Sequence, residues 1–193
     1  MSNPSSISIR PYAPDHVEDL FGAARESIRE VHPWLPWCHP GYAIEEARSW
    51  VEGQVAAFAR GEEHEFAIFG PSGRYVGGCG VNLIVQSQRR ANLGYWVRSS
   101  EMGKGVAVAA VRLAAAWAFQ NTALERLEIV VAVGNTRSQR VAEKAGAVRE
   151  GVLRRRLLLH DTFHDAVMYS LVRGDPQRTA RRRGGAGPSV GHQ

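Results

Sequence analysis

The sequence predicts one α/β domain with a mixed, mostly antiparallel central sheet. Its 193 residues can bury one sizeable core, and 44% of them are hydrophobic, as in ordinary globular proteins. Segments of β-strand composition alternate along the chain with segments of helical periodicity. Two of the strand segments are joined by residues 70–73, whose glycines, proline and serine are typical of a tight turn in a hairpin.

A strand and two helices open the predicted domain. Residues 6–10 alternate in polarity, with Ile7 and Ile9 on one face, as expected of a strand. Residues 15–28 carry apolar side chains at helical spacing, which predicts an amphipathic helix. Residues 43–58 show the same spacing and follow a proline and a glycine, so we expect a second helix there.

Three strand segments come next, at residues 65–69, 75–85 and 91–98. The polar run 86–90 separates the last two and has the composition of a turn. Glycines inside the second segment predict a bulge or a close approach of another group to the backbone. They are Gly77, Gly78 and Gly80.

The C-terminal half adds two helices and three strands. The segment from Val106 to about Gln120 is apolar nearly all round, which predicts a helix buried against the sheet. Residues 136–145 form the second predicted helix, and Gly146 stands where a left-handed cap is expected. The predicted strands are residues 127–133, 147–159 and 162–172.

The net charge of +5 is concentrated near the C-terminus. Residues 173–193 hold five arginines and one acid, so they carry +4 and the remaining residues only +1. This Arg- and Gly-rich composition predicts a disordered, solvated tail after a single domain at residues 1–172. The alternative is an arm that tethers the protein to RNA or a ribosome; nucleic-acid binding is not expected otherwise.

Cysteine content and hydropathy predict a cytoplasmic location. Cys38 and Cys79 are too few for a disulfide framework and are expected to be free thiols. The cysteines and histidines lack the spacing of metal ligands, so we expect no metal. The longest apolar stretch, residues 106–119, is too short to span a bilayer, and the N-terminus lacks a secretion signal, so no membrane association is expected.

A glycine-bearing turn between a strand and a helix is the most informative motif. Glycines let the backbone approach a ligand closely, and the following helix start presents unpaired N–H groups to an anion. A second polar motif, at residues 135–146, follows about thirty residues later. The residues expected to bind a phosphate are Met102, Gly103, Lys104, Gly105, Val106 and Ala107.

Together these motifs resemble the GNAT superfamily of acyl-CoA N-acyltransferases, and within it the RimJ/RimL-like branch, which acetylates the N-termini of ribosomal proteins. The turn is similar to the family pattern Gln/Arg-x-x-Gly-x-Gly/Ala at its last two fixed positions, with Met102 in place of the Gln or Arg. Residues 33–37, 94–97, 135–138 and 163–171 also resemble this branch. The resemblance covers roughly residues 6–172 and implies a sheet of about seven strands, splayed between the fourth and fifth, with about four helices.

The resemblance also implies that acetyl-CoA is the co-substrate. The main-chain N–H of Trp96 or Val97 would hold the thioester carbonyl oxygen, as in an oxyanion hole. Asn135 would contact the pantetheine arm, and Ser138 would contact the cofactor and protonate the departing thiolate, with Tyr95 as the second candidate catalytic residue. Each has a structural alternative, because Asn135 is a favourable helix N-cap and the strand side chains suit a core.

The acceptor-binding candidates are Trp34, Trp37 and Glu65. The connector between the first two helices walls this side in the family, and aromatic walls suit a peptide; the alternative is that both tryptophans anchor the connector. Some relatives carry a carboxylate as general base where this chain has Leu157. The base therefore stays open among Glu65, Asp165, His160, His164 and a chain of water molecules.

The predicted reaction is direct attack of a primary amine on acetyl-CoA in a ternary complex. An N-terminal α-amine of a protein or peptide is the expected acceptor, because its pKa of about 7.7–8.0 leaves it partly neutral in the cytosol. The alternatives are a small-molecule amine, as in antibiotic detoxification, and a non-catalytic CoA-binding or ribosome-associated module. A homodimer is compatible with each of these functions.

Overall fold

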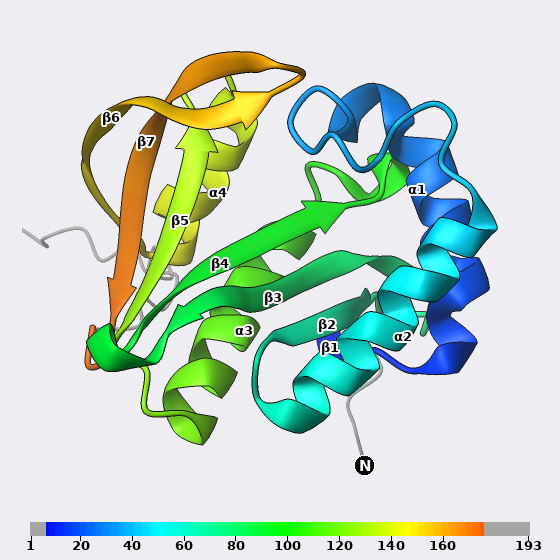
Figure 1. The fold of residues 1–193 in the computed structure, drawn as a ribbon, viewed down its shortest axis with the longest axis horizontal. Coiled ribbons are helices and arrows are strands. Elements are labelled where there is room, and N and C mark those ends of the chain that lie inside the picture. Colours follow the sequence, from blue (N-terminus) through cyan, green and yellow to red (C-terminus); the bar gives the residue numbers. More distant parts are fainter. Residues whose placement is uncertain (1–6, 176–193) are drawn as a thin grey trace, which may run out of the picture.

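The structure is a computed structural model that describes residues 7–175. A seven-stranded sheet in the order β1-β2-β3-β4-β5-β7-β6 forms its centre (Figure 1). The strands are β1 (Ser8–Pro11), β2 (His64–Phe69), β3 (Tyr75–Val85), β4 (Arg90–Val97), β5 (Arg126–Ala132), β6 (Val148–Leu159) and β7 (Thr162–Val172). The helices are α1 (Val17–Val31), α2 (Ile44–Arg60), α3 (Val106–Asn121) and α4 (Thr136–Ala145). Neighbouring strands are antiparallel except β4 and β5, which confirms the predicted fold class.

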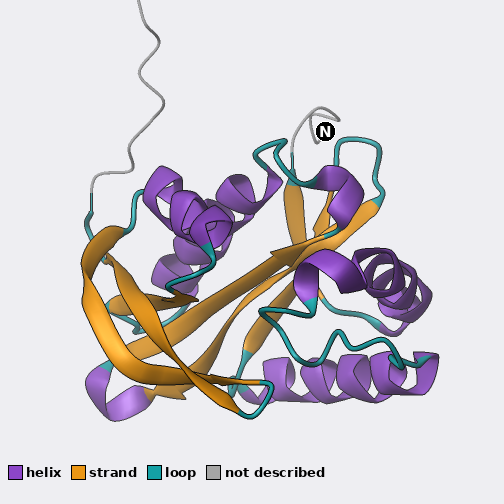
Figure 2. Cartoon of the chain, turned by 90° about the horizontal axis from the view of Figure 1, so that it is seen from above, coloured by secondary structure: helices purple, strands orange, loops and turns teal. Residues whose placement is uncertain are grey.

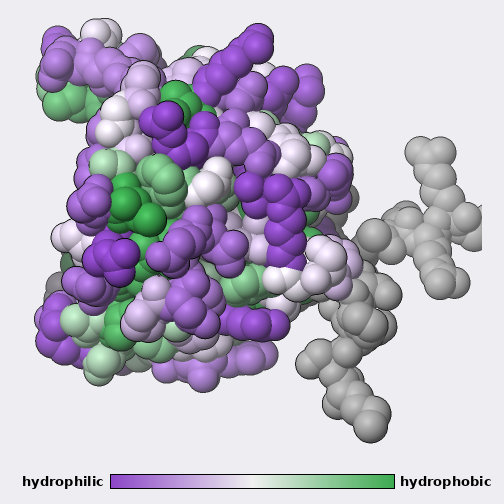
Figure 3. All heavy atoms as spheres, turned by 90° about the vertical axis from the view of Figure 1, so that its right-hand side faces the viewer, coloured by the Kyte–Doolittle hydropathy of each residue, from purple (hydrophilic) through white to green (hydrophobic). Residues whose placement is uncertain are grey.

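The helices cover the two faces of the sheet in pairs, α1 with α2 and α3 with α4 (Figure 2). Neighbouring residues of β2 point to opposite faces, as the pleat requires. Phe66 contacts Trp117 of α3, whereas Ala67 belongs to the core cluster of α1 and α2. The surface on the α1–α2 side is mostly hydrophilic, with apolar patches between the polar side chains (Figure 3).

The sheet opens between β4 and β5. These strands pair only from Arg90 opposite Arg126 to Asn92 opposite Glu128, and beyond Asn92 they diverge (Figure 1). The splay expected between the fourth and fifth strands is therefore confirmed. Residues 93–97 of β4 have no strand partner on that side, and we call the resulting gap between β4 and β5 the split.

Most element bounds match the prediction, and the largest difference is in α1. The helix begins at Val17, because Pro14 starts a short 3-10 turn at Pro14–His16. It continues beyond Ile28 to Val31, whose side chain is buried. The predicted close approach at the β3 glycines is confirmed: a Cβ on Gly78 would lie 2.7 Å from the hydroxyl of Tyr12.

Arg173 was expected to begin the solvated tail, but it is bound to the end of α3. Its guanidinium donates to the carbonyls of Thr122 and Leu124 at 2.9 and 2.6 Å and pairs with Glu125 at 3.0 Å. It also caps the carbonyl of Phe119. The rest of the predicted tail, residues 176–193, lies outside the described residues. No helix within residues 7–175 is long and apolar enough to cross a bilayer.

Candidate functional site

The turn between β4 and α3 is built around two glycines. Gly103 and Gly105 have φ angles of 79° and 83°, in the left-handed region that favours glycine. Gly105 directly precedes α3, and no side chain caps the first N–H groups of the helix. These N–H groups can therefore donate hydrogen bonds to a phosphate, and the positive end of the helix dipole favours its negative charge, as the sequence predicts.

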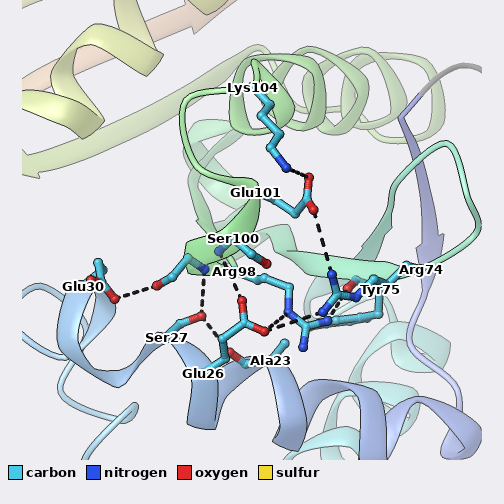
Figure 4. A network of polar contacts seen from close by, with 11 residues as sticks. Ala23, Glu26, Ser27, Glu30, Arg74, Tyr75, Arg98, Ser100, Glu101 and Lys104 are labelled. Carbon is cyan, nitrogen blue, oxygen red and sulfur yellow. Dashed lines mark hydrogen bonds and ion pairs between the residues drawn. The ribbon is translucent and has the colours of Figure 1, made fainter.

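Side chains of α1 hold the start of this turn (Figure 4). Glu26 accepts hydrogen bonds from the Ser100 N–H at 3.1 Å and from Nε of Arg98 at 2.8 Å. Partial burial raises the pKa of Glu26, but the hydrogen bonds from Ser100 and the charge of Arg98 outweigh it and lower the pKa. Ser27 accepts from the Ser99 N–H at 3.0 Å, and the Ser99 hydroxyl donates to Glu30 at 2.6 Å. The backbone before the glycine turn is thus fixed by a helix that lies far away in sequence.

Two cationic side chains border the turn. Lys104 is exposed and bonds Glu101 at 3.1 Å, and Glu101 also lies 4.0 Å from Arg74 (Figure 4). Arg137, near the start of α4, lies 4.0 Å from the sulfur of Met102. Sequence reasoning missed Arg137, although its place within the 135–138 motif was a usable signal. It brings a positive charge from the β5 side of the split to the turn that follows β4.

Tyr95 and Ser138 meet across the split. The Tyr95 hydroxyl lies 2.8 Å from Oγ of Ser138 and donates to the Ser138 carbonyl at 2.9 Å. Burial raises the pKa of Tyr95 to about 12, although the hydrogen bond with Ser138 opposes the shift, so this phenol keeps its proton at neutral pH. Asn135 accepts from the Ser138 N–H at 3.0 Å, so its oxygen acts as the N-cap of α4 and positions Ser138.

Main-chain direction along β4 separates the two predicted backbone donors. The Arg98 N–H bonds Val76 on the β3 side, whereas the Arg89 carbonyl accepts from Arg126 on the β5 side. Since these groups alternate along a strand, the Val97 N–H points into the split and the Trp96 N–H points toward β3. Val97 is therefore the better placed of the two to hold a carbonyl oxygen.

The connector between α1 and α2 reaches both sides of the split. Trp34 packs against Gly134, where an added Cβ would lie 3.3 Å from the indole ring. Trp37 is partly exposed, and its ring meets that of Trp96 edge to face at 5.4 Å. The turn between β6 and β7 also joins the connector, because His160 bonds the carbonyl of His32 at 3.0 Å. Trp34 thus lies on the β5 side of the split, and Trp37 lies on the β4 side.

The remaining base candidates lie apart from the Tyr95–Ser138 pair. Asp165 accepts from the main-chain N–H of Arg155 at 2.8 Å, and His164 is exposed on β7 opposite Leu157. Glu65 lies on β2, two strands away from β4, where Asn82 donates to it at 2.8 Å. No group of three or more His, Cys, Asp or Glu side chains in the described part of the chain could hold a metal ion.

Comparison with known proteins agrees with this geometry. Residues 6–148 match the acetyltransferase (GNAT) domain family. YdaF of Bacillus subtilis is 37% identical over 101 residues, which span 52% of this chain and 55% of that protein. The ribosomal-protein-serine acetyltransferase of Escherichia coli is 27% identical over 167 residues, 86% of this chain and 93% of that one.

A solved structure shows the same architecture. Mycobacterium smegmatis RimJ in complex with CoA-disulfide aligns with a TM-score of 0.80 and 26% identity, over 89% of this chain and 84% of that one. The glycine turn, the uncapped α3 and the split between β4 and β5 are the parts of this chain that fit such a cofactor. The chain belongs to the GNAT acetyltransferase family and is an N-acetyltransferase.

Proposed function

We propose that the protein transfers the acetyl group of acetyl-CoA to the N-terminal α-amine of a protein. The observation that carries this proposal is the contact of Tyr95 and Ser138 across the split, 2.8 Å between their oxygens. It places a hydroxyl pair beside the unpaired edge of β4, where a thioester would lie. Relatives named for ribosomal-protein acetylation support a protein acceptor and a cytoplasmic place of action.

The chain's own groups would hold the cofactor at two places. The N–H groups at the start of α3 would bind the pyrophosphate, with Lys104 and Arg137 adding positive charge. The unpaired edge of β4 would accept the pantetheine arm in the split, as a strand edge accepts an extended chain. The cofactor supplies an activated acetyl group as a thioester.

Three groups of the protein would act during transfer. The Val97 N–H stabilises the oxygen of the acetyl group as charge develops on it. Ser138 gives its proton to the sulfur as the new N–C bond forms and the C–S bond breaks, and it takes the proton that the nitrogen loses. Tyr95 donates or accepts a hydrogen bond at Oγ of Ser138 and so keeps that oxygen in place through the exchange.

The acceptor would approach from the side of the connector. Trp34 and Trp37 line this side without closing it, since Trp37 is 37% exposed. Two aromatic walls suit an extended peptide terminus, whose first residues would be bound through apolar and main-chain contacts.

Thiol release from acetyl-CoA would test the proposal directly. The acceptor panel holds peptides with free N-termini, the same peptides with blocked N-termini, and small amines such as aminoglycosides and polyamines. We expect turnover on free N-termini, loss of turnover when the terminus is blocked, and acetylation of the α-nitrogen by fragment mass spectrometry. Turnover confined to small amines would replace this proposal with small-molecule detoxification. Binding of CoA without turnover on any amine would point to a non-catalytic module.

A further inference from the structure

Glu65 belongs to a row of residues that runs across the sheet toward the split. It pairs with Gly80 on β3, and Gly80 pairs with Gly94 on β4. Directly paired residues of neighbouring strands place their side chains on the same face. The face is that of α1 and α2, because a Cβ on Gly78, two residues from Gly80, would touch Tyr12 of their core cluster.

The two glycines leave room on this face, and the Glu65 carboxylate uses part of it. A Cβ on Gly80 would lie only 2.2 Å from Oε2 of Glu65, so the carboxylate extends over Gly80 toward β4. A Cβ on Gly94 would have only the amides of Asn82 and Asn92 as neighbours, at 3.8 Å. The space beyond the carboxylate, above Gly94, is therefore lined by amides.

The same amides fix the carboxylate. Asn92 donates to Asn82 at 2.9 Å, and Asn82 donates to Oε1 of Glu65 at 2.8 Å. Oε2 accepts no hydrogen bond from the described residues. Trp96 lies on the side of the row away from the two asparagines, because its indole nitrogen would lie 2.8 Å from a Cβ on Gly78. One carboxylate oxygen is thus held in place, and the other is available to a ligand on the row.

This row ends where the split begins. Pairing of β4 with β5 stops at Asn92, and Gly94 lies two residues further along β4. With strands about 4.8 Å apart, roughly 10 Å separate Gly80 from the far side of β4. An amine with one or two ordered waters would bridge that span, and the row would then connect the carboxylate with the place proposed for the thioester.

The ionisation of Glu65 suits this position. Burial raises its pKa to about 7, with a smaller rise from the charge of Glu63, while the hydrogen bond from Asn82 acts in the opposite direction. Tyr12 and Cys79 are the other titratable groups that feel its charge, and burial keeps both protonated. A carboxyl group that titrates near neutrality both attracts an ammonium and releases its proton readily.

We propose that Glu65 binds the acceptor ammonium at Oε2 and takes its proton, directly or through water above Gly80 and Gly94. This inference rests on the proposed function. It assigns the general base, a role that Leu157 cannot fill at the position where some relatives carry a carboxylate. The ammonium loses one proton to Glu65 and becomes a neutral amine, which then attacks the acetyl carbon. Its second proton leaves during transfer by way of Ser138, and Glu65 returns the first to solvent after product departs.

A pH profile of Glu65→Gln tests the proposal. The productive complex pairs ionised Glu65 with a protonated acceptor, so kcat/KM of the wild type with a peptide acceptor should be bell-shaped. It should fall with a slope of one below the pKa of Glu65, about 7, and fall again above the pKa of the α-amine, about 7.7–8.0. In Glu65→Gln the acceptor must bind already neutral, so kcat/KM should rise to a plateau above the pKa of the α-amine, without an alkaline limb, and kcat should drop about 100-fold. Glu65→Asp should retain the bell shape. Glu62→Gln, which changes an exposed carboxylate in the turn before β2, serves as the matched control and should keep the wild-type profile.

The result separates this inference from the proposed function. If the wild type turns over peptides and Glu65→Gln keeps both its rate and a bell-shaped profile, Glu65 is not the base and the proposed function stands. A lower rate with the bell-shaped profile retained would also overturn the assignment, because Glu65 would then act only structurally. If the wild type acetylates no amine, the proposed function itself fails. Unchanged CoA binding and an unchanged unfolding midpoint should accompany the expected result.

Gly80→Ala provides an independent variant. Its Cβ would overlap Oε2 of Glu65 and drive the carboxylate from the row. We expect the same loss of the bell shape and a comparable loss of kcat, with KM for acetyl-CoA unchanged. Gly53→Ala, an added methyl with no neighbour within 4 Å, is the control. Wild-type kinetics in folded Gly80→Ala would contradict a role for the row.

Discussion

Tyr95 and Ser138 join the two halves of the molecule across the split, with their hydroxyl oxygens 2.8 Å apart. One lies on β4 and the other near the start of α4, 43 positions later. Their contact is made where β4 and β5 no longer pair, so side chains take over the bridging that main-chain hydrogen bonds provide at Arg90–Asn92. Because the phenol of Tyr95 is buried and protonated, it is better suited to hold Ser138 in place than to transfer a proton itself.

Because Tyr95 acts through Ser138, the two substitutions should not be additive. We expect Ser138→Ala to lower kcat about 100-fold, as for loss of a general acid, and Tyr95→Phe about 5-fold to 10-fold, as for loss of one hydrogen bond. The double variant should be no slower than Ser138→Ala alone, in steady-state thiol release. Thr136→Ala on the same helix is the control. Fully multiplicative effects would mean that the residues act separately.

Glu26 should control cofactor affinity without touching the cofactor. Glu26→Gln weakens the bonds to Ser100 and Arg98, so the glycine turn loses part of its fixed geometry. Hydrogen bonds to charged groups contribute about 1.5–3 kcal/mol, and partial exposure reduces this, so we expect KM for acetyl-CoA to rise about 3-fold to 10-fold. The value of kcat should stay unchanged. Calorimetric titration would compare the CoA affinity of Glu26→Gln with that of Glu18→Gln on the same helix; equal affinities in both variants would contradict the prediction.

Gly105→Ala should weaken cofactor binding through backbone strain. Its φ of 83° is unfavourable for a residue with a Cβ, by about 1–2 kcal/mol. We expect the turn to shift, KM for acetyl-CoA to rise about 10-fold, and the unfolding midpoint to fall slightly. Gly151→Ala, with no neighbour within 4 Å and no positive φ, should leave both quantities unchanged. Unaltered KM in Gly105→Ala would show that the turn does not contact the cofactor.

Glu150 should make folding sensitive to acid. Hydrogen bonds from Arg126, at 2.6 and 2.5 Å, and from Ser170 lower its pKa to about 2 against a slight opposing effect of burial. The folded pKa is depressed, so the stabilisation is complete above the unfolded value of 4.5 and is lost as pH falls toward 2.

Glu150→Gln should therefore destabilise the protein by about 0.5 kcal/mol near pH 6, a small value because the carboxylate is partly exposed. Urea unfolding at several pH values measures the difference from wild type, which should shrink below pH 4.5. Glu52→Gln, an exposed carboxylate on α2, should show no such trend. A difference independent of pH would attribute the effect to packing.

Local sequence patterns predicted the elements well, because periodicity and caps act over a few residues. The bounds of α4 and of β3 were predicted to the residue, and Gly146 has the left-handed φ of 106° expected of a cap. The end of α1 was missed because the chain continues as a helix past Ile28 with no cap to mark its end. Irregular starts, such as the 3-10 turn at Pro14, are equally hard to place from spacing alone.

The sequence motifs indicate candidate site residues, whereas the contacts that support these residues could not be predicted. Glu26 and Glu30 look like ordinary solvated acids on a helix, and only the fold brings them to Ser99 and Ser100. Arg173 looked like part of a basic tail, yet it binds carbonyls at the end of α3. Contacts between residues 49 to 74 positions apart leave no local periodicity, so composition cannot report them.

The segment that holds the glycine turn and the segment proposed to meet the acceptor are consecutive parts of one stretch of chain. Glu26, Ser27 and Glu30 of α1 grip the turn, and the connector with Trp34 and Trp37 follows directly. Substitutions, insertions and deletions confined to the connector can thus change the choice of acceptor while the contacts that fix the glycine turn are preserved. Residues 32–43 are therefore the place to build a library for new acceptors, with Glu26, Ser27 and Glu30 left unchanged.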